Sequence, residues 1–227
     1  MRTKRRFRYL DEQNLQTVGD VVTAMQTLDR DLNRSDLRRL TAFNTTYRII
    51  SQNVRQALRD GRFQHPDFLQ RFDTRFAAYY FNALRAYLHG RDAPVVWRKT
   101  FDLNRTGQLA PLAAMALGVN AHVNNDIPQV LRDCGARPRH YRDYQLVNDI
   151  IRDCIGEIID NLEPGGRLDP HHRILRPLYV MGMTWFIRRW RANAWKHYRQ
   201  LTTQRLDRPG LERFASSYVR PLSFLPG

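Results

Sequence analysis

The chain has little cysteine: only Cys134 and Cys154 occur among its 227 residues, and they do not form a Cys-x-x-Cys pair. Two cysteines are too few for a disulfide scaffold, and their spacing does not match a thiolate zinc site. We therefore expect a reduced, cytoplasmic protein.

Long apolar runs are also missing. No stretch approaches the roughly 20 uncharged apolar residues that a membrane-spanning helix needs. The residues from Met1 to Arg8 are basic, but they are not followed by the hydrophobic segment of a secretory signal peptide. We predict neither a transmembrane segment nor a signal peptide.

Several catalytic and nucleotide-binding motifs are absent from the sequence. There is no glycine-rich phosphate loop of either common type, and no Gly-x-Ser-x-Gly elbow for a nucleophilic serine. The alternating apolar pattern and Asn-Gly turns of β-hairpins are missing too. These absences argue against nucleotide-binding α/β proteins, serine hydrolases of the α/β type and all-β folds.

Lysine is nearly absent: three of the 37 basic residues are lysines, which leaves 34 arginines and a net charge of +15. Such a balance favours anionic partners, although arginine bias also follows from the base composition of a genome. The stretch from Arg188 to Arg205 carries six basic residues and no acidic one, but no known nucleic-acid motif accompanies it. If a nucleic acid or another polyanion binds, we expect it to contact Arg188, Arg189 and Arg199.

Apolar residues recur at three- and four-residue steps along most of the chain, which is typical of amphipathic helices. Thr17 and Ser35 are suitable N-caps for the first two helices. Pro66 is suited to the first position of the next helix, and Gly90 follows its expected end. Pro177 is expected to begin the last long helix.

These helices have no linker or internal repeat between them, so we predict an all-α, single-domain bundle of about seven or eight helices. The predicted domain spans 1–227. Within it we expect a basic N-terminal arm at 1–16, a loop at 164–172 and an irregular tail at 206–227, with one short helical stretch from Leu211 to Tyr218.

A dense polar block, Gly118 to Pro128, interrupts an otherwise apolar helix. His122 and Asp126 are four residues apart and would share one helix face. Three carboxamides lie beside them, and burying so many polar groups is costly unless each has a partner. We predict that this block forms the catalytic site, through His122, Asp126, Asn120 and Asn125.

The same block carries a resemblance to a family of helical bacterial proteins of unknown function. It is centred on Asn120-Ala121-His122 and Asp126-Ile127-Pro128, where Pro128 is expected to kink or end the helix. Other matching positions extend the resemblance from about Val18 to Leu201. They are Phe43-Asn44 with Tyr47, Phe72-Asp73 with Phe76-Ala77 and Tyr80 through Ala83, Trp97 with Phe101, Val147-Asn148-Asp149, and Arg191 with Ala194-Trp195.

A narrower fragment, His122, Asp126 and Pro128, is similar to a zinc-binding motif of zinc-dependent phospholipase C and P1-type nucleases. This resemblance implies one divalent metal, such as zinc, held by His122 and Asp126. Those families use several metals with further histidines and an N-terminal tryptophan, whereas this chain starts with Met1 and has no second paired-histidine motif. The alternative is a buried hydrogen bond between His122 and Asp126, in which the aspartate fixes the imidazole tautomer.

Six further residues are predicted to contact a ligand. Asp73 is the first candidate for an additional metal ligand, because it lies between aromatic residues of an otherwise apolar helix. It and Asn148 are also suited to hydrogen bonds between helices. The predicted ligand-binding residues are Asp73, Tyr80, Trp97, Asn148, Arg191 and Trp195.

Two interpretations of Arg191 remain open: an internal salt bridge to Asp126 or Asp73, or an arginine that holds an anion beside the site. Among the tryptophans of this region, we expect Trp185 and Trp195 to pack in the core, with the one between them, Trp190, at the surface.

The sequence therefore favours a hydrolase-like enzyme acting on a small ester or phosphoester, with or without a divalent metal. One alternative is a protein that binds a small molecule in the same polar pocket without turning it over. The other is a protein that binds nucleic acid or another polyanion, in which His122 and Asp126 have a structural role.

Overall fold

The fold is all-α, as predicted. The computed structural model describes residues 7–106, 108–162 and 170–225, with the backbone alone for 170–176 and 179, and this part of the chain contains no strand. Eight α-helices have ten residues or more, and two shorter ones complete the set. They are α2 (Val18–Asn33), α3 (Thr41–Arg59), α4 (Pro66–Leu88), α5 (Val95–Arg105), α6 (Pro111–Asn120), α7 (Ile127–Asp133), α8 (Tyr141–Leu162), α9 (Pro170–Thr202), α10 (Arg208–Ser217) and α11 (Val219–Ser223).

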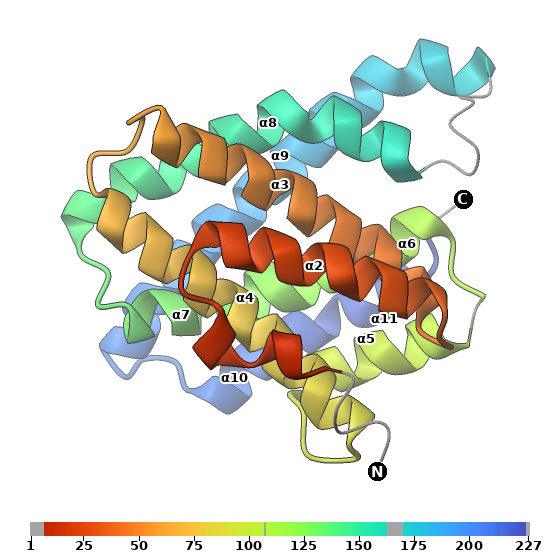
Figure 1. The fold of residues 1–227 in the computed structure, drawn as a ribbon, viewed down its shortest axis with the longest axis horizontal. Helices are drawn as coiled ribbons and strands as arrows, with labels where there is room; N and C mark the ends of the chain where they lie inside the picture. Colours follow the sequence, from red (N-terminus) through yellow and green to blue (C-terminus); the bar gives the residue numbers. More distant parts are fainter. Residues whose placement is uncertain (1–6, 107, 163–169, 226–227) are drawn as a thin grey trace.

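One continuous helical segment, from Pro111 to Asp133, forms the centre of the bundle. It consists of α6, the π-helix η4 (Ala121–Asp126) and α7. α3 and α4 lie against it on one side, and α9, α10, α11 and α5 complete its surroundings (Figure 1). α2 packs on α3 further out, while α8 lies between α3 and α9. The segment that carries the polar block is thus covered by other helices.

The helix ends follow the expected local rules at several positions. Thr17 caps α2 through a capping box, because its Oγ1 accepts a hydrogen bond from the Asp20 amide while the Asp20 carboxylate accepts one from the Thr17 amide. Pro66 occupies the first turn of α4, and Gly90 follows its end with a φ of 63°. These three boundary predictions are confirmed.

Two other boundary predictions are wrong. Ser35 does not cap α3, since a 3₁₀ turn (η3, Arg38–Leu40) separates it from the first residue, Thr41. Pro177 does not begin α9 but lies inside it, seven residues after its start at Pro170. An interior proline lacks only its own backbone N–H, so surrounding turns can continue the helix across it.

The ends of the chain are more ordered than we expected. Residues 1–6 of the predicted arm lie outside the described residues, but its remainder forms two 3₁₀ turns, η1 (Arg8–Leu10) and η2 (Glu12–Asn14). Leu10 and Leu15 are buried, so this part is packed and is not a free basic arm.

The tail at 206–227 was predicted to be irregular apart from one helical stretch. That stretch is present as α10, and a second helix, α11, follows it, so most of the tail is helical. Leu211, Ala215 and Leu222 recur at helical spacing and are buried, which explains why it packs. Of the predicted loop 164–172, the residues up to 169 lie outside the described part, and the rest belong to α9.

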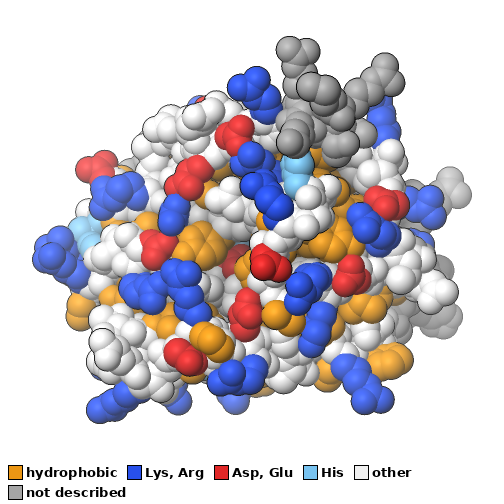
Figure 2. Space-filling view, turned by 90° about the horizontal axis from the view of Figure 1, so that it is seen from below, with side chains coloured by type: hydrophobic (Ala, Val, Ile, Leu, Met, Phe, Trp, Pro, Cys, Tyr) orange, Lys and Arg blue, Asp and Glu red, His pale blue; other side chains and the backbone are white. Residues whose placement is uncertain are grey.

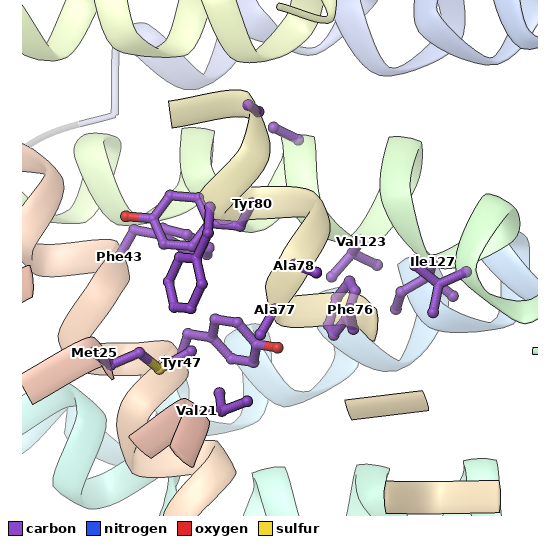
Figure 3. Packing of buried hydrophobic residues seen from close by; sticks show 14 of the residues in the cluster. Val21, Met25, Phe43, Tyr47, Phe76, Ala77, Ala78, Tyr80, Val123 and Ile127 are labelled. Atoms are coloured by element: carbon purple, nitrogen blue, oxygen red, sulfur yellow. The ribbon is translucent and has the colours of Figure 1, made fainter. Parts of the chain in front are cut away.

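Aromatic side chains fill the space between α3, α4 and the central segment (Figure 3). Phe43 meets Tyr80 edge-on, with ring centroids 5.0 Å apart, and Tyr80 stacks on Trp97 at 5.1 Å. Tyr47 lies between Phe43 and Phe76, and its hydroxyl is on the side of Phe76. This aromatic layer surrounds the polar block, which is therefore well shielded from water.

None of the described helices is long and apolar enough to cross a membrane.

Close contact between α3 and α6 depends on a glycine. A Cβ atom placed on Gly118 would lie 2.3 Å from Cγ of Phe43, nearer than such atoms approach in proteins. The absence of a side chain at Gly118 therefore lets Phe43 pack directly on the backbone one turn before His122.

Gly118→Ala is expected to lower the free energy of unfolding by about 3 kcal/mol, because the methyl group overpacks a rigid aromatic contact. Gly182→Ala is the matched control: its Cβ meets no described atom within 4 Å, and alanine should stabilise α9 by about 0.5–1 kcal/mol. Urea unfolding of both variants measures the difference. Equal stability of the two variants would contradict this account of the α3–α6 contact.

Candidate functional site

The polar block lies on a wide helical turn. Between α6 and α7 the chain adopts the π-helix η4, a rare form that occurs often at functional sites. Pro128 lies two residues after the end of η4 and has no N–H to donate to the carbonyl four residues earlier. The wider turn compensates for the hydrogen bond that Pro128 cannot donate. The helix therefore does not end at Pro128 but continues as α7.

Asp126 is the centre of a buried hydrogen-bond network. Its Oδ2 accepts a hydrogen bond from Trp97 Nε1 at 2.9 Å and lies 2.9 Å from His122 Nδ1. Its Oδ1 accepts from the Asn125 amide at 2.8 Å. The tautomer of His122 with its proton on Nδ1 donates to Asp126 Oδ2 and so completes three side-chain donors around this carboxyl group. The histidine–aspartate hydrogen bond that the sequence allowed as an alternative is present.

The Asp126 carboxylate is fully buried, with 0% of its surface exposed. No lysine or arginine among the described residues lies within ion-pair distance of it, and its one basic neighbour is His122. Burying a carboxylate is unfavourable unless donors replace its water, and here three side chains do so. They come from α5 and from two positions of η4, so the network fixes how these elements pack.

The imidazole of His122 is held between aromatic rings. It stacks on Phe76 with centroids 3.4 Å apart and planes 5° from parallel, and it meets the Tyr47 ring edge-on at 4.6 Å. Burial lowers the pKa of His122, and the neighbouring Asp126 opposes this only in part. His122 is therefore neutral at pH 7, with an unprotonated Nε2.

The Nε2 atom of His122 is buried and has no hydrogen-bond partner among the described residues. His122 lines a cavity of about 60 Å³ between α3, α4, α6, η4, α8 and α9. This volume is enough for a few water molecules or a small ligand. The cavity is lined by Phe43, Thr46, Tyr47, Ile50, Val54, Leu69, Phe72, Asp73, Phe76, Val119, His122, Val123, Val147, Ile151, Ile187 and Arg191.

Asp73 lines the same cavity from α4. Only 6% of its surface is exposed, and its Oδ2 has no hydrogen-bond partner among the described residues. Burial raises the pKa of Asp73 from 3.8 to about 7, so a large fraction of it is protonated at neutral pH. The cavity therefore contains a neutral base and a carboxyl group that is able to donate a proton.

Tyr47 brings a phenol to this cavity. Burial raises the pKa of Tyr47 well above its usual value, and the charges of Asp73 and Asp126 raise it further. Its hydroxyl therefore stays protonated at neutral pH and remains available as a hydrogen-bond donor.

Arg191 of α9 forms no salt bridge with Asp126 or Asp73, so the first interpretation of this arginine is wrong. Its Nε donates to Asn148 Oδ1 at 2.6 Å and its Nη2 to the Tyr144 carbonyl at 2.9 Å. The guanidinium also lies over the Tyr144 ring, 4.2 Å from its centroid. Asn148, a predicted ligand-binding residue, thus serves as a hydrogen-bond partner of Arg191.

The other predicted site residues do not line the cavity. Asn120 donates to the carbonyl of Ala215 at 2.9 Å and so connects the central segment to α10. Asn125 and Trp97 act through Asp126, while Tyr80 packs against Trp97.

The tryptophan predictions are wrong for two of three residues. Trp190 is buried, with 3% of its surface exposed, whereas Trp185 is 61% exposed. Trp195 is half-buried against Tyr144 and Tyr141, outside the cavity. The inward face of α9 includes Ile187, Trp190, Arg191, Ala194 and Tyr198, and Trp185 lies on the opposite side.

Two cavity residues, Tyr47 and Phe76, were not predicted as site residues. Both looked like ordinary core positions, because aromatic residues at helical spacing usually pack in a core. In the sequence, both residues belong to the family pattern, in which Tyr47 follows Asn44 and Phe76 follows Asp73 after three positions. Only the structure shows that they enclose the imidazole of His122.

The donor atoms do not form a ready metal site. Both oxygens of Asp126 accept hydrogen bonds, and Nδ1 of His122 is used by Asp126. No cluster of three or more histidine, cysteine, aspartate or glutamate side chains within the described part of the chain is arranged to hold a metal ion.

Comparison with known proteins identifies the family. The chain belongs to a family of unknown function, DUF5995, whose sequence profile matches residues 18–220. This confirms the resemblance to a family of unknown function. No curated protein and no solved structure matches the chain.

Asp73→Asn is expected to stabilise the fold in a pH-dependent way. The folded protein holds a proton on Asp73 up to about pH 7, whereas the unfolded chain has lost it above about pH 4. Wild-type stability should therefore fall as the pH rises through this window. The variant removes this loss and should gain a few kcal/mol in the free energy of unfolding at pH 8, and much less at pH 5.

Urea unfolding at the two pH values measures this effect. Asp92→Asn, at an exposed aspartate, is the control and should show no such pH-dependent gain. If the gain from Asp73→Asn is the same at both pH values, the carboxyl group of Asp73 is not protonated in the folded protein.

Proposed function

We propose that the protein binds a small molecule in the cavity beside His122 and that His122 acts on it as a general base. The observation that carries this proposal is the pair of different environments around one imidazole. Nδ1 is fixed by Asp126 at 2.9 Å, while Nε2 is buried and unpartnered among the described residues, and His122 is one of the residues that line the cavity. A carboxylate that holds one ring nitrogen orients the ring and increases the basicity of the other nitrogen.

Asp73 provides a complementary acid. Burial raises the pKa of Asp73 and lowers that of His122, so both groups are largely uncharged near neutral pH. Two titratable groups whose environments shift their pKa values in opposite directions are typical of acid–base sites. His122 would accept a proton, and Asp73 would donate one to a leaving group or to a developing negative charge.

Ester hydrolysis is the reaction class that fits these groups best. His122 Nε2 would take a proton from a water molecule whose oxygen attacks the ester carbonyl. Collapse of the tetrahedral intermediate would break the bond to the alcohol, which leaves with a proton from Asp73 or from the protonated His122. The Tyr47 hydroxyl, as a buried donor in the same cavity, is suited to stabilise the negative oxygen.

The zinc-dependent mechanism suggested by the fragment His122, Asp126 and Pro128 fits less well. Catalytic zinc sites use three protein ligands. Here His122 Nε2 and Asp73 are the free donors, while Asp126 is fully engaged with Trp97, Asn125 and His122. We therefore derive no step through a metal ion.

The polyanion alternative stays a prediction. Arg188, Arg189 and Arg199 are exposed, and Arg189 lies over the ring of Trp185 at 5.6 Å. Figure 2 shows one face of the molecule, on which basic side chains are scattered among acidic ones. The cytoplasmic location also stays a prediction.

His122→Gln tests the proposal with a panel of short-chain p-nitrophenyl esters. We expect the wild type to hydrolyse at least one of them, and His122→Gln to lower this rate by about 100-fold or more, since a positioned base contributes that much. Asp126→Asn should lower the rate as well, because it removes the carboxylate that orients the ring. His89→Gln is the control, since His89 is at the end of α4 and does not line the cavity.

Circular dichroism and thermal unfolding establish that each variant is folded. If His122→Gln and Asp126→Asn hydrolyse the esters as fast as the wild type and the control, the activity does not come from this cavity and the proposal fails. If no ester is hydrolysed but small molecules bind in a manner that depends on His122, the protein is a binding protein without catalysis.

A further inference from the structure

Arg191 is a buried cation without an acidic partner. Only 3% of its surface is exposed. No carboxylate of the described residues lies within ion-pair distance of it, and its two hydrogen bonds go to the neutral oxygens of Asn148 and Tyr144. Neutral oxygens satisfy its donors but do not neutralise its charge. A buried guanidinium is usually paired with an acid, because moving an isolated charge out of water is unfavourable.

The guanidinium retains donor capacity. It has five N–H groups in a planar fork, and the hydrogen bonds formed with described residues use Nε and Nη2, but not Nη1. Arg191 lines the same cavity as His122, and the other ionisable groups of that cavity are uncharged or protonated near neutral pH. Below about pH 7, where most of Asp73 is protonated, the cavity thus contains the positive charge of Arg191 without a negative charge to balance it.

We propose that the ligand of this cavity carries a carboxylate group that pairs with Arg191. This inference rests on the proposed function, since it assumes that a small molecule binds beside His122. A guanidinium and a carboxylate form a strong, charge-assisted pair, often with two parallel hydrogen bonds. A single arginine in a cavity of about 60 Å³ is matched in charge and size to one carboxylate, whereas a phosphate dianion would keep an unbalanced charge.

A second, apolar hollow lies next to the cavity and could hold the apolar part of the ligand. Val119 and Ile187 line the cavity and also line a second hollow of about 300 Å³ between α6, α9 and α11. Ile187 lies one helical turn before Arg191 on α9. All residues around this second hollow are apolar or glycine, among them Met115, Phe186 and Leu222. We therefore expect the carboxylate to carry an alkyl chain that points past Ile187 toward this hollow.

Matched pairs of acids and amides test the inference at pH 6.5, where most of Asp73 is protonated and simple carboxylic acids are ionised. Butanoate with butanamide, and octanoate with octanamide, have the same shape and differ in charge. Isothermal titration calorimetry should give a dissociation constant for each acid that is roughly ten-fold or more below that of its amide, because only the acid pairs with Arg191. Octanoate should bind more tightly than butanoate, because its chain reaches the apolar hollow.

Two variants locate the preference. Arg191→Met keeps the length of the side chain without its charge and should remove the preference for the acid, while amide binding is retained. Arg188→Met is the matched control: it removes one exposed positive charge from the same helix and should leave the preference unchanged. If Arg191→Met does not fold, Arg191→Lys keeps the charge but not the fork, and the ratio should fall partway.

The outcomes separate the two proposals. If amides bind as tightly as acids and His122→Gln weakens both, the carboxylate inference is overturned while the proposed site stands. If methyl phosphate binds more tightly than butanoate, the ligand class is wrong. If no probe binds to the wild type, both the inference and the proposed small-molecule site fail.

Discussion

The fully buried carboxylate of Asp126 is the constraint on which the centre of this protein depends. It has been removed from water, and three side-chain donors replace the lost hydration: the Trp97 indole, the His122 imidazole and the Asn125 amide. Loss of any donor would leave a buried charge less well satisfied, which is among the most destabilising changes in a protein interior. The network therefore holds α5 against the π-helix η4 and fixes the orientation of the imidazole. The same interaction would position His122 for the catalytic role that we propose.

The consequence for chemistry is that one nitrogen of His122 is committed and the other is free. Phe76 stacks on the ring, Tyr47 meets it edge-on, and burial keeps it neutral at pH 7. A neutral, oriented imidazole beside a protonated carboxyl group is a costly arrangement to maintain if its only purpose is packing, since apolar side chains of similar volume would fill the same space without buried polar atoms. The unpartnered atoms of His122 and Asp73, together with the unneutralised charge of Arg191, lie around one cavity. This coincidence supports a binding site.

Much of the fold followed from the sequence, because helical periodicity, Thr17, Pro66 and Gly90 act locally. The contact between His122 and Asp126 also followed from their spacing of four residues. Other features depend on long-range packing that spacing does not encode. The partner of Arg191 is Asn148 of α8, although carboxylates were available as candidates, and the exposed tryptophan of α9 is Trp185 and not Trp190. The π-turn was equally hidden, since Pro128 predicts a disturbed helix but not the form that the disturbance takes. The tail was underestimated because its two helices are short and are stabilised by contacts with the rest of the bundle.

The most direct test of this account is the protonation state of His122 in solution. Long-range ¹H–¹⁵N correlation spectra of the seven histidine side chains, assigned by comparison with His122→Gln, report which ring nitrogen carries the proton. The account predicts a neutral ring at pH 7 with the proton on Nδ1 and a bare Nε2, and it predicts that the ring takes up its second proton below pH 6.5, the ordinary pKa of histidine. A proton on Nε2, or a charged imidazolium at pH 7, would contradict it, because His122 would then have no free nitrogen with which to act as a base.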